Sequence, residues 1–472
     1  MNFEKLYIGG QWVSSASGKW IDVENPAAGT IFARVPAGNA ADVDAAVQAA
    51  RRAFPHWASV SLAGRIAVMK RMLTHLKAVR SQIIDLEVRE LGSPVSFAET
   101  AHCDYQYTRI QSYIDLAPQV DAVRKLPAST VYREPVGVVG CITPWNYPLG
   151  QVVQKVIPAI LMGNTVVLKP SQHTPLTCYL LVQAFADAGL PDGVLNLVTG
   201  RGAEVGNVLS GHPQVDMISF TGSTSGGITV ARKALESVKK ISLELGGKSP
   251  CILLRSDDYL QGLRLCLNSI FLNAGQTCTA LSRLLIPLED KEKIEALLKE
   301  LVHEYPIGDP SDPQTKVGPL ASLQQFQKVS AYLHTGLQEG ALLLTGKIPD
   351  SAGHGYYVSP AVFTNVTNDM KIAREEIFGP VLCVLTYKNV EEAIQIANDT
   401  PYGLNAAVCG PDKQEAIRVA RRIQSGNIYI NDGPRDTAAP FGGYKKSGLG
   451  REGGIDGMIE FTQQKALFDT GH

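Results

Sequence analysis

Short apolar runs alternate with longer amphipathic segments through the middle of the chain. Four of these runs are rich in aliphatic residues and predict buried strands, at residues 136–142, 165–168, 194–198 and 217–220. The segments between them predict helices, for example Leu176 to Ala188, which is closed by Gly189 and Pro191. Strands that alternate with helices predict a parallel sheet with crossover helices. Ligands of such a sheet bind at the carboxyl ends of its strands, so the loops after these strands are candidate sites of chemistry.

The same alternation resumes near Pro250. A strand pattern is followed by a helix that runs through Phe271, and a later helix pattern begins at Glu391. The strand patterns of this part lie at residues 251–254, 381–386 and 427–430. We therefore predict an α/β protein with a second α/β unit over residues 246–430.

Two further segments fit neither unit. Residues 118–133 place valines and a leucine in a loose alternation that predicts β-structure, and the tail around residues 459–462 has a similar pattern. We predict that these two segments pair with each other outside the main body of the protein.

The composition excludes several classes of protein. The chain has 472 residues, of which 45% are hydrophobic and 19% charged, with 44 basic against 45 acidic residues. This balance does not provide the basic surface of a nucleic-acid-binding or membrane-surface protein. The N-terminus lacks the basic and apolar segments of a signal peptide, and no apolar stretch reaches the ~18 residues of a membrane span.

The eight cysteines are scattered without a CxxC pair, and the nine histidines show no HxxxH spacing. This distribution argues against a zinc site or a disulfide framework and favours a reducing compartment. We expect a soluble cytoplasmic protein without a metal, a nucleic-acid partner or a membrane partner.

One cysteine lies in a loop that suits a nucleophile. Residues 271–280 predict the end of a helix, a small polar loop that holds Cys278, and then the start of a strand. The thiolate is the reactive form of cysteine, and a loop can expose it and lower its pKa through local dipoles. Taken alone, the segment leaves open the more common alternative, an ordinary buried thiol.

Two other segments supply side chains that such a nucleophile needs. Glu244 stands between Leu243 and Leu245, and apolar surroundings raise a carboxyl pKa toward the range of a general base. The alternative for Glu244 is a strand edge that faces water. Asn146 lies in the loop after the strand at 136–142 and offers an amide donor of the kind that stabilises an oxyanion, unless it is a helix N-cap.

At this point the chain resembles the aldehyde dehydrogenase superfamily, of the non-phosphorylating NAD(P)-dependent kind. The resemblance extends nearly end to end. Its motifs are Tyr7 to Trp12, Pro144-Trp145-Asn146, Glu244-Leu245-Gly246-Gly247-Lys248, the cysteine loop, Glu375 to Pro380, Pro440 to Gly448, and Glu460-Phe461-Thr462.

The resemblance implies a fold with two doubly wound parallel-sheet domains and a small β oligomerisation arm. The implied domains are residues 1–117 and 137–245 for dinucleotide binding, 246–430 for catalysis, 118–136 and 458–472 for the arm, and 431–457 for a substrate and anchor loop. A homodimer or a homotetramer is the expected assembly.

The resemblance also implies a mechanism. Cys278 attacks the aldehyde carbonyl, Asn146 and the Cys278 N–H hold the oxyanion, hydride passes to the nicotinamide, and Glu244 activates the water that hydrolyses the thioester. Members that transfer the acyl group to coenzyme A lack this glutamate, so a free carboxylate is the expected product. A non-catalytic protein of the same fold is a third possibility, and it would lack at least one of these three side chains.

For the cofactor, the resemblance implies binding by Trp145, Lys169, Ser171, Gln172, Arg201, Gly222, Ser223, Glu376 and Phe378. Many relatives have a glutamate where this chain has Gln172, and that glutamate binds the adenosine ribose. An amide can donate to a 2′-phosphate, whereas a carboxylate repels it. Lys169 and Arg201 could neutralise the phosphate, although Arg201 could equally be solvated. We therefore expect NADP or NAD as the cofactor, with NADP slightly favoured.

The expected substrate site follows from one helix face and one loop. Tyr147, Gln151 and Gln154 share a helix face that lines the aldehyde tunnel in the family, and here this face is polar. Thr277 and Thr279 flank the cysteine.

Arg435 belongs to a loop in which the family keeps residues that contact the far end of the substrate. A guanidinium there could grip a distal carboxylate through a bidentate fork, or it could pair with Asp432 or Asp436 and face solvent. These features favour a small polar aldehyde, with succinic semialdehyde as the leading candidate. Simple aliphatic and aromatic aldehydes remain open.

Overall fold

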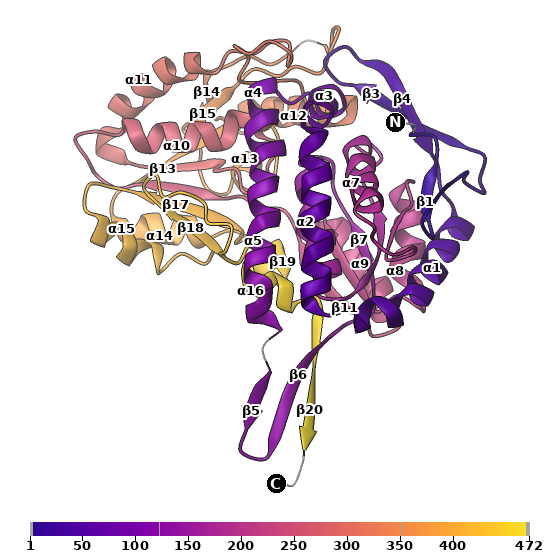
Figure 1. The fold of residues 1–472 in the computed structure, drawn as a ribbon. Coiled ribbons are helices and arrows are strands. Elements are labelled where there is room, and N and C mark those ends of the chain that lie inside the picture. The colour runs from indigo at the N-terminus through magenta and orange to yellow at the C-terminus, as the bar shows by residue number, and fades with distance from the viewer. Residues whose placement is uncertain (1–2, 122, 350, 469–472) are drawn as a thin grey trace.

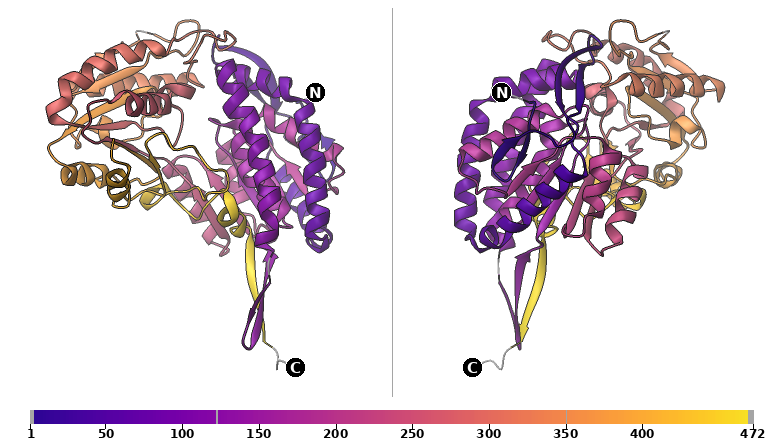
Figure 2. Two further views of the ribbon diagram at one scale, coloured as in Figure 1. Left: turned by 60° about the vertical axis from the view of Figure 1, so that its left-hand side comes forward. Right: turned by 90° about the vertical axis from the view of Figure 1, so that its right-hand side faces the viewer.

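The computed structural model describes residues 3–121, 123–349 and 351–468. The chain forms two large α/β units side by side, and a slender β arm projects from them (Figures 1 and 2). The C-terminal end of the predicted arm, residues 469–472, lies outside the described residues.

An eight-stranded sheet forms the first unit. Its strands are β1 (Leu6–Ile8), β2 (Gln11–Val13), β7 (Val138–Ile142), β8 (Thr165–Lys169), β9 (Leu195–Leu197), β10 (Met217–Thr221), β11 (Lys240–Glu244) and β19 (Gly448–Leu449). They lie in the order β19-β11-β10-β7-β8-β9-β1-β2. The five strands from β11 to β9 are parallel, and antiparallel strands extend both edges. Every residue of β7, β8, β9 and β10 is buried, which explains their continuous apolar runs.

Helices cover both faces of this sheet. One face carries α1 (Ala40–Ser59), η3 (Gly202–Gly206), α8 (Asn207–Gly211) and α9 (Thr224–Leu235). The other carries α6 (Pro148–Leu161) and α7 (Leu176–Asp187), with α2 (Leu62–Ala78), α3 (Arg80–Leu86), η1 (Glu87–Leu91), α4 (Val95–Phe97), η2 (Ala98–Asp104), α5 (Tyr105–Val120) and α16 (Gly454–Ile459) packed around them. Val138 and Val139 are neighbours on β7 but belong to different hydrophobic clusters, because successive strand side chains point to opposite faces.

A seven-stranded sheet forms the second unit. Its strands are β12 (Pro250–Leu253), β13 (Arg283–Pro287), β14 (Leu342–Thr345), β15 (Ala361–Thr364), β16 (Val381–Tyr387), β17 (Asn405–Cys409) and β18 (Asn427–Ile430). The order is β14-β15-β16-β13-β12-β17-β18, and all pairs are parallel except β14 with β15. The connecting helices are α10 (Leu260–Phe271), η4 (Leu272–Gly275), η5 (Leu288–Asp290), α11 (Lys291–Leu301), η6 (Val302–Glu304), α12 (Leu323–Gln338), α13 (Lys371–Arg374), α14 (Val390–Asn398), α15 (Lys413–Ala420) and η7 (Lys445–Ser447).

Two smaller antiparallel sheets complete the structure. The hairpin of β3 (Trp20–Asn25) and β4 (Thr30–Pro36) lies at the N-terminal side. The arm contains β5 (Arg124–Leu126), β6 (Ser129–Pro135) and β20 (Thr462–Phe468) in the order β20-β6-β5. The predicted pairing between the 118–133 segment and the tail is therefore present. Strand β20 forms an edge of this sheet, where unpaired backbone groups are available to another strand.

Three predicted boundaries are wrong. Residues 118–120 continue α5, because Val120 extends the buried helical stripe that includes Ile114 and Ala117. The strand after the cysteine loop begins at Arg283, since turn hydrogen bonds at Ala280 and Ser282 hold the chain in an irregular conformation. The tail is helical through Ile459 and becomes a strand only at Thr462.

Within the described ranges, the structure contains no helix that is both long and apolar enough to cross a membrane. All eight cysteines are described and all are free thiols.

Candidate active site

The cysteine loop leaves its helix through a left-handed turn. After α10 ends at Phe271, Asn273, Ala274 and Gly275 adopt φ angles of 54°, 52° and 71°. Non-glycine residues in this region are strained and keep that conformation only where their surroundings impose it. A Cβ at Gly275 would collide with the carbonyl oxygen of Gly379, so glycine allows the turn to contact this segment of the second unit.

Buried amides tie this turn to the first unit. The Asn146 Nδ2 donates to the carbonyl oxygen of Gln276 at 2.9 Å, and the Asn273 Nδ2 donates to the carbonyl oxygen of Asn146 at 2.9 Å. The Gln276 side chain donates to the Asn273 carbonyl and accepts from the Ala321 N–H. The N-cap of α6 is Tyr147, so the N-cap alternative for Asn146 is wrong. The network instead fixes the Asn146 amide against the nucleophile loop.

Cys278 lies between two cavities. A cavity of about 360 Å³, here called the inner cavity, has Cys278 on its wall. A second cavity of about 170 Å³, here called the cofactor-side cavity, is also lined by Cys278 and by Asn146. The other seven cysteines are buried, whereas Cys278 is partly exposed. Its sulfur is therefore the thiol that molecules in both cavities can approach.

The charges around Cys278 oppose its ionisation. Burial raises the pKa of the Cys278 thiol to about 12, and the carboxylates of Glu376 and Glu244 add to the rise. The guanidinium of Arg435 acts in the opposite direction. The lowered pKa that the loop position suggested for Cys278 is therefore wrong, since burial and these carboxylates disfavour the thiolate.

Glu244 is a buried carboxyl group at the end of a strand. It is the last residue of β11 and is 2% exposed, so the water-facing alternative is wrong. Neither of its carboxylate oxygens has a hydrogen-bond partner among the described residues. Burial raises the pKa of Glu244 well above its usual range and Glu452 adds to the rise, while Lys155 and Arg451 lower it. A carboxyl group in these surroundings can take up and release a proton near neutral pH.

A buried charged pair lies next to Glu244 and was not predicted. Lys155 Nζ donates to one carboxylate oxygen of Glu452, and Gln154 Nε2 donates to the other at 2.5 Å. All three side chains are buried. The sequence feature that could have identified this pair is a lysine inside the mostly apolar and fully buried helix α6. Its partner could not be identified, since 297 residues separate the two in sequence.

The cofactor-side cavity brings together five of the predicted cofactor residues. It is lined by Trp145, Gly222, Ser223, Glu376 and Phe378, which come from both units. The rings of Trp145 and Phe378 meet edge to face with centroids 5.4 Å apart, and Glu376 accepts from the Gly247 N–H at 3.0 Å.

The residues that line this cavity suit part of a nicotinamide dinucleotide. Ser223 is the N-cap of α9 and lies on the cavity wall, so the helix N-terminus faces a position suited to a phosphate. A Cβ at Gly246 would collide with the Glu376 carboxylate, so the absence of a side chain there lets this glutamate approach the backbone.

The other four predicted cofactor residues lie outside this cavity, at and after the end of β8. Lys169 is buried, and burial lowers the pKa of its ammonium to about 8. Ser171 accepts from the His173 N–H at 3.2 Å, and Gln172 is partly exposed. Arg201 is exposed. Burial lowers the pKa of His173 and the charges of Lys169 and Arg201 lower it further, so these basic groups lie near one another.

All six predicted substrate residues line the inner cavity with Cys278; they are Tyr147, Gln151, Gln154, Thr277, Thr279 and Arg435. The Tyr147 hydroxyl and the Thr277 hydroxyl lie 3.0 Å apart. The Gln151 Oε1 is buried and has no hydrogen-bond partner among the described residues. The wall around the nucleophile is therefore polar, as the sequence predicts.

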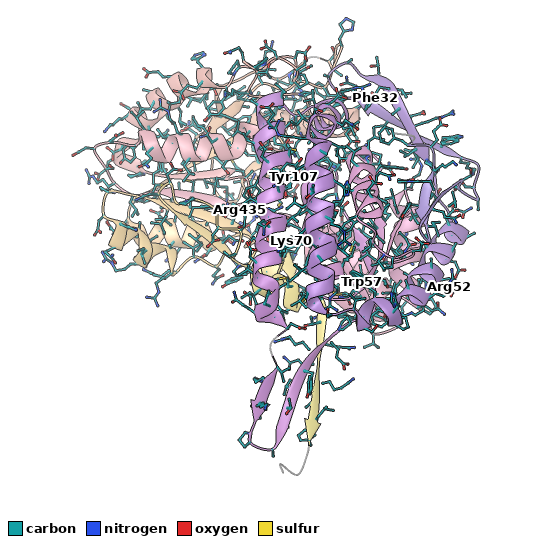
Figure 3. All side chains as sticks on the ribbon, in the orientation of Figure 1. Phe32, Arg52, Trp57, Lys70, Tyr107 and Arg435 are labelled. Atoms are coloured by element: carbon teal, nitrogen blue, oxygen red, sulfur yellow. The ribbon has the colours of Figure 1, made fainter. Side chains whose placement is uncertain are left out.

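Arg435 approaches this wall from a loop. It lies over the rings of Phe441 and Tyr105, with 4.9 and 5.9 Å from its Cζ to the ring centroids, and Figure 3 shows it beside α5. Within the described residues, it forms no ion pair with Asp432 or Asp436, and Asp436 instead accepts from the Ala438 N–H.

A second arginine on the same cavity, Arg109, was not predicted. It is buried in α5 and lies 4.9 Å from the centroid of the Tyr105 ring. The sequence feature that could have identified Arg109 is its position on the helix face that also holds Gln106 and Tyr113. This face is buried in the structure.

Another unpredicted group lies behind the wall of the inner cavity. His102 stacks on Tyr147 with centroids 4.8 Å apart, and its Nδ1 lies 3.4 Å from a Glu87 carboxylate oxygen. The other oxygen of Glu87 accepts from the Leu149 N–H in the first turn of α6. These contacts fix the start of α6, where Asn146 and Tyr147 leave the preceding loop.

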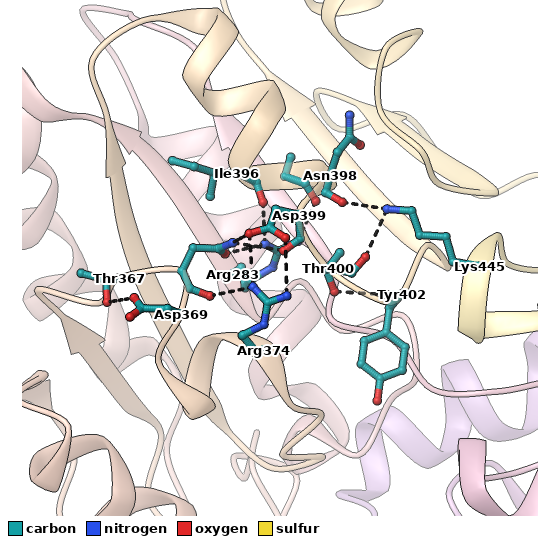
Figure 4. A network of polar contacts seen from close by, with 12 residues as sticks. Arg283, Thr367, Asp369, Arg374, Ile396, Asn398, Asp399, Thr400, Tyr402 and Lys445 are labelled. Atoms are coloured by element: carbon teal, nitrogen blue, oxygen red, sulfur yellow. Dashed lines mark hydrogen bonds and ion pairs between the residues drawn. The ribbon is translucent and has the colours of Figure 1, made fainter.

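A polar network around Arg283 holds the nucleophile loop in the second unit (Figure 4). Arg283 begins β13 and donates to the carbonyl oxygens of Lys248, Ile396 and Ala397 at 3.0, 2.9 and 2.8 Å. The Lys248 contact joins the segment after Glu244 to the strand that follows the cysteine loop.

Comparison with known proteins assigns the family and the fold. Residues 12–467 match the family model of the aldehyde dehydrogenases, and the chain belongs to the aldehyde dehydrogenase family. A Staphylococcus aureus protein whose name assigns it to the aldehyde dehydrogenases is 42% identical over 468 residues, which cover 99% of this chain and 98% of the relative.

Solved structures give the same assignment. A mutant of aldehyde dehydrogenase C from Pseudomonas syringae, in complex with NAD⁺ and octanal, is similar with a TM-score of 0.97 at 42% identity, over 99% of this chain and 97% of the other. Mycobacterium tuberculosis aldehyde dehydrogenase in complex with NAD⁺ has a TM-score of 0.96 at 41% identity, covering 99% and 98%. Betaine aldehyde dehydrogenase from Staphylococcus aureus, in complex with NAD⁺, has a TM-score of 0.95 at 37% identity, over 98% of this chain and 94% of the other.

The predicted family, the α/β fold class and the enzyme class are thus confirmed. The chain is an NAD(P)-dependent aldehyde dehydrogenase.

The charge of Glu244 predicts a shift in the reactivity of Cys278. Glu244→Gln removes a carboxylate that raises the pKa of the thiol. The pH at which alkylation of Cys278 by iodoacetamide reaches half its maximal rate should therefore fall by on the order of one pH unit. Mass spectrometry of the peptide that contains Cys278 follows the reaction in the enzyme without cofactor. Glu90→Gln, which removes a buried carboxylate that does not line the inner or the cofactor-side cavity, is the control and should leave the profile in place. Slower alkylation of the Glu244→Gln variant at every pH would show instead that Glu244 removes the thiol proton.

Proposed function

We propose that the enzyme oxidises a small polar aldehyde with a carboxylate at its far end to the free acid, with succinic semialdehyde as the leading candidate. The observation that carries the proposal is the position of Cys278 between the cofactor-side cavity and a polar inner cavity whose charged wall residues are arginines. The chemistry follows from Cys278, Asn146 and Glu244, and the choice of substrate follows from the inner cavity.

In the proposed first step, the Cys278 thiolate adds to the aldehyde carbon. One N–H of the Asn146 amide is used by the Gln276 carbonyl, which leaves the second N–H free to donate to the developing oxyanion with the Cys278 backbone N–H. When bound, the oxidised nicotinamide supplies the hydride acceptor, and Trp145, Glu376 and Phe378 would hold it. Collapse of the tetrahedral adduct with loss of hydride leaves a thioester on Cys278.

In the proposed second step, Glu244 takes a proton from the water that attacks the thioester. A buried carboxylate without hydrogen-bond partners among the described residues is free to bind that water. Its raised pKa makes it a stronger base than an exposed glutamate. The thiolate then leaves, and the product is a carboxylate. The buried Glu244 argues against acyl transfer to coenzyme A, since family members that perform that reaction lack this glutamate.

For the cofactor, we propose NADP⁺ with NAD⁺ also accepted. The basic groups of Lys169 and Arg201 lie near His173, which follows Gln172 in the chain, and these groups suit a 2′-phosphate. Glu24 opposes this preference. Its charge raises the pKa of His173, so a negative charge lies near the same basic groups and would repel a 2′-phosphate.

The proposed assembly is a homodimer or a homotetramer that uses the arm. Leu467 and Phe468 on β20 are 48% and 81% exposed, and an edge strand with large apolar side chains favours pairing with a second chain. The eight free thiols favour a reducing compartment, and we propose that the enzyme is cytoplasmic.

The proposed chemistry predicts distinct defects for the three catalytic side chains. Cys278→Ala should abolish oxidation, and Asn146→Ala should lower kcat on the order of 10²- to 10³-fold, as expected for loss of an oxyanion donor. Glu244→Gln should give one rapid turnover and then a stalled acyl-enzyme. Stopped-flow absorbance of the reduced cofactor and intact-protein mass spectrometry measure these outcomes. Cys103→Ala, at a buried thiol away from both cavities, is the matched control. Turnover by Cys278→Ala at the wild-type rate would refute the mechanism.

The substrate and cofactor proposals predict the pattern of initial rates. Succinic semialdehyde with NADP⁺ should give the highest kcat/KM among the four combinations of succinic semialdehyde or butanal with NADP⁺ or NAD⁺. Gln172→Glu should shift the preference toward NAD⁺, because a carboxylate repels the 2′-phosphate. Equal or higher rates with butanal and NAD⁺ would leave the family assignment intact and refute both preferences.

The arm predicts that assembly depends on its exposed apolar residues. The double variant Leu467→Asp and Phe468→Asp should lower the oligomeric state measured by light scattering after size-exclusion chromatography. Leu342→Asp, at an exposed leucine on the edge strand β14, is the control. An unchanged mass for the double variant would show that the subunits associate elsewhere.

A further inference from the structure

We propose that Arg109 and Arg435 form one anion-binding subsite that selects aldehydes with a carboxylate at their far end, and that Arg109 is its buried anchor. The inference rests on the proposed function and adds a specificity-determining residue to it. It is carried by the surroundings of Arg109, by the position of Arg435, and by the place of both in the cavities.

Arg109 is a buried cation whose contacts are all neutral. Its side chain is near the middle of α5, and the residue is 7% exposed. Its Nη1 donates to the Gln106 Oε1 at 2.8 Å and to the carbonyl oxygen of Gly150 at 3.4 Å. No carboxylate among the described residues forms an ion pair with it. Burying a guanidinium without an opposite charge is costly, so the site favours an anion that enters from the cavity.

Arg435 brings a second cation to the same place. The Cζ atoms of Arg109 and Arg435 lie 4.9 and 5.9 Å from the centroid of one ring, that of Tyr105. Burial lowers the pKa of Arg109, and the charge of Arg435 lowers it further, which shows that each cation raises the energy of the other. A single anion between them would offset both the repulsion and the desolvation of Arg109.

The two arginines stand where the inner cavity continues outward. A third cavity of about 350 Å³ is here called the outer cavity. It shares six residues with the inner cavity, namely Tyr105, Arg109, Gln154, Thr279, Arg435 and Phe441. Apart from Cys278, the ionisable side chains on the inner wall are the two arginines and the tyrosines. The rest of that wall is built from neutral threonine, glutamine, alanine, glycine and phenylalanine residues. An aldehyde whose carbonyl is at Cys278 therefore finds the positive charge of this wall at the two arginines alone.

The chemistry of this subsite favours a carboxylate. Guanidinium groups bind planar carboxylates through parallel N–H donors, and their charge-assisted hydrogen bonds are about twice as strong as neutral ones. Arg109 is preorganised by Gln106 and Gly150, so it loses little conformational freedom on binding. The substrate class is therefore an oxo-carboxylate in which the aldehyde and the carboxylate are at opposite ends.

The test compares substrates in the full-length enzyme. Arg109→Met should lower kcat/KM for succinic semialdehyde on the order of ten- to a hundredfold more than for butanal, the range expected when a charged hydrogen bond is lost. The loss should fall mainly on KM, because the arginine holds the distal end and not the reacting atoms. Arg109→Lys keeps the charge without the fork and should give an intermediate selectivity. Arg65→Met is the matched control, since Arg65 is also buried and donates to a backbone carbonyl, but lies outside all three cavities.

A binding measurement keeps the proposal testable if the variants turn over poorly. Succinate should slow alkylation of Cys278 in the wild-type enzyme, and this protection should be lost in Arg109→Met. Equal losses with both aldehydes, or equal protection in wild type and variant, would overturn the subsite. Failure of the wild-type enzyme to oxidise either aldehyde would instead contradict the substrate proposal itself. The two failures are therefore distinguishable.

Discussion

The hydrogen bond from Asn146 to the carbonyl oxygen of Gln276 joins the two halves of the active site. It connects the loop that opens α6 in the first unit to the left-handed turn that precedes Cys278 in the second. The strained φ angles of Asn273 and Ala274 are maintained because the turn is held from several sides, by amide hydrogen bonds and by close contact with Gly379. Oxyanion donor and nucleophile are thus placed by a single set of contacts, and neither could shift alone.

Electrostatics divide the site into two regions with Cys278 between them. Carboxyl groups of Glu244 and Glu376 lie on one side and raise the pKa of the thiol, whereas the guanidinium of Arg435 acts from the substrate side and lowers it. Burial and the two carboxyl groups disfavour the thiolate, and a guanidinium favours it. The reactivity of the thiol therefore depends on which of these groups a bound molecule screens or displaces.

The sequence predicted the parts of the fold that depend on local pattern. Continuous apolar runs identified β7, β8 and β10, because a parallel strand is buried on both faces. The apolar neighbours of Glu244 likewise indicated its burial. Boundaries failed where local pattern was ambiguous, as at 118–120, where Val120 fits both the loose alternation of a strand and the buried stripe of α5. Partners distant in the chain, such as Lys155 and Glu452, had no local signal at all, because only the folded sheet order brings them together.

Arg109, which was not predicted, lies in a part of the fold that is separate from the segments of Cys278, Asn146 and Glu244. Glu244 lies at the end of a central strand, and Asn146 and Cys278 lie in loops that are fixed to the two sheets, so their geometry is set by the two cores. Arg109 and Arg435 belong to α5 and to an exposed loop, which lie outside both sheets. Substitutions on this outer wall can change the charge of the inner cavity without disturbing the strands that hold the catalytic groups. Under the proposed function, one catalytic scaffold can therefore serve different aldehydes. The proposed selectivity depends on two arginines that come together only when α5 and the loop pack against the ring of Tyr105.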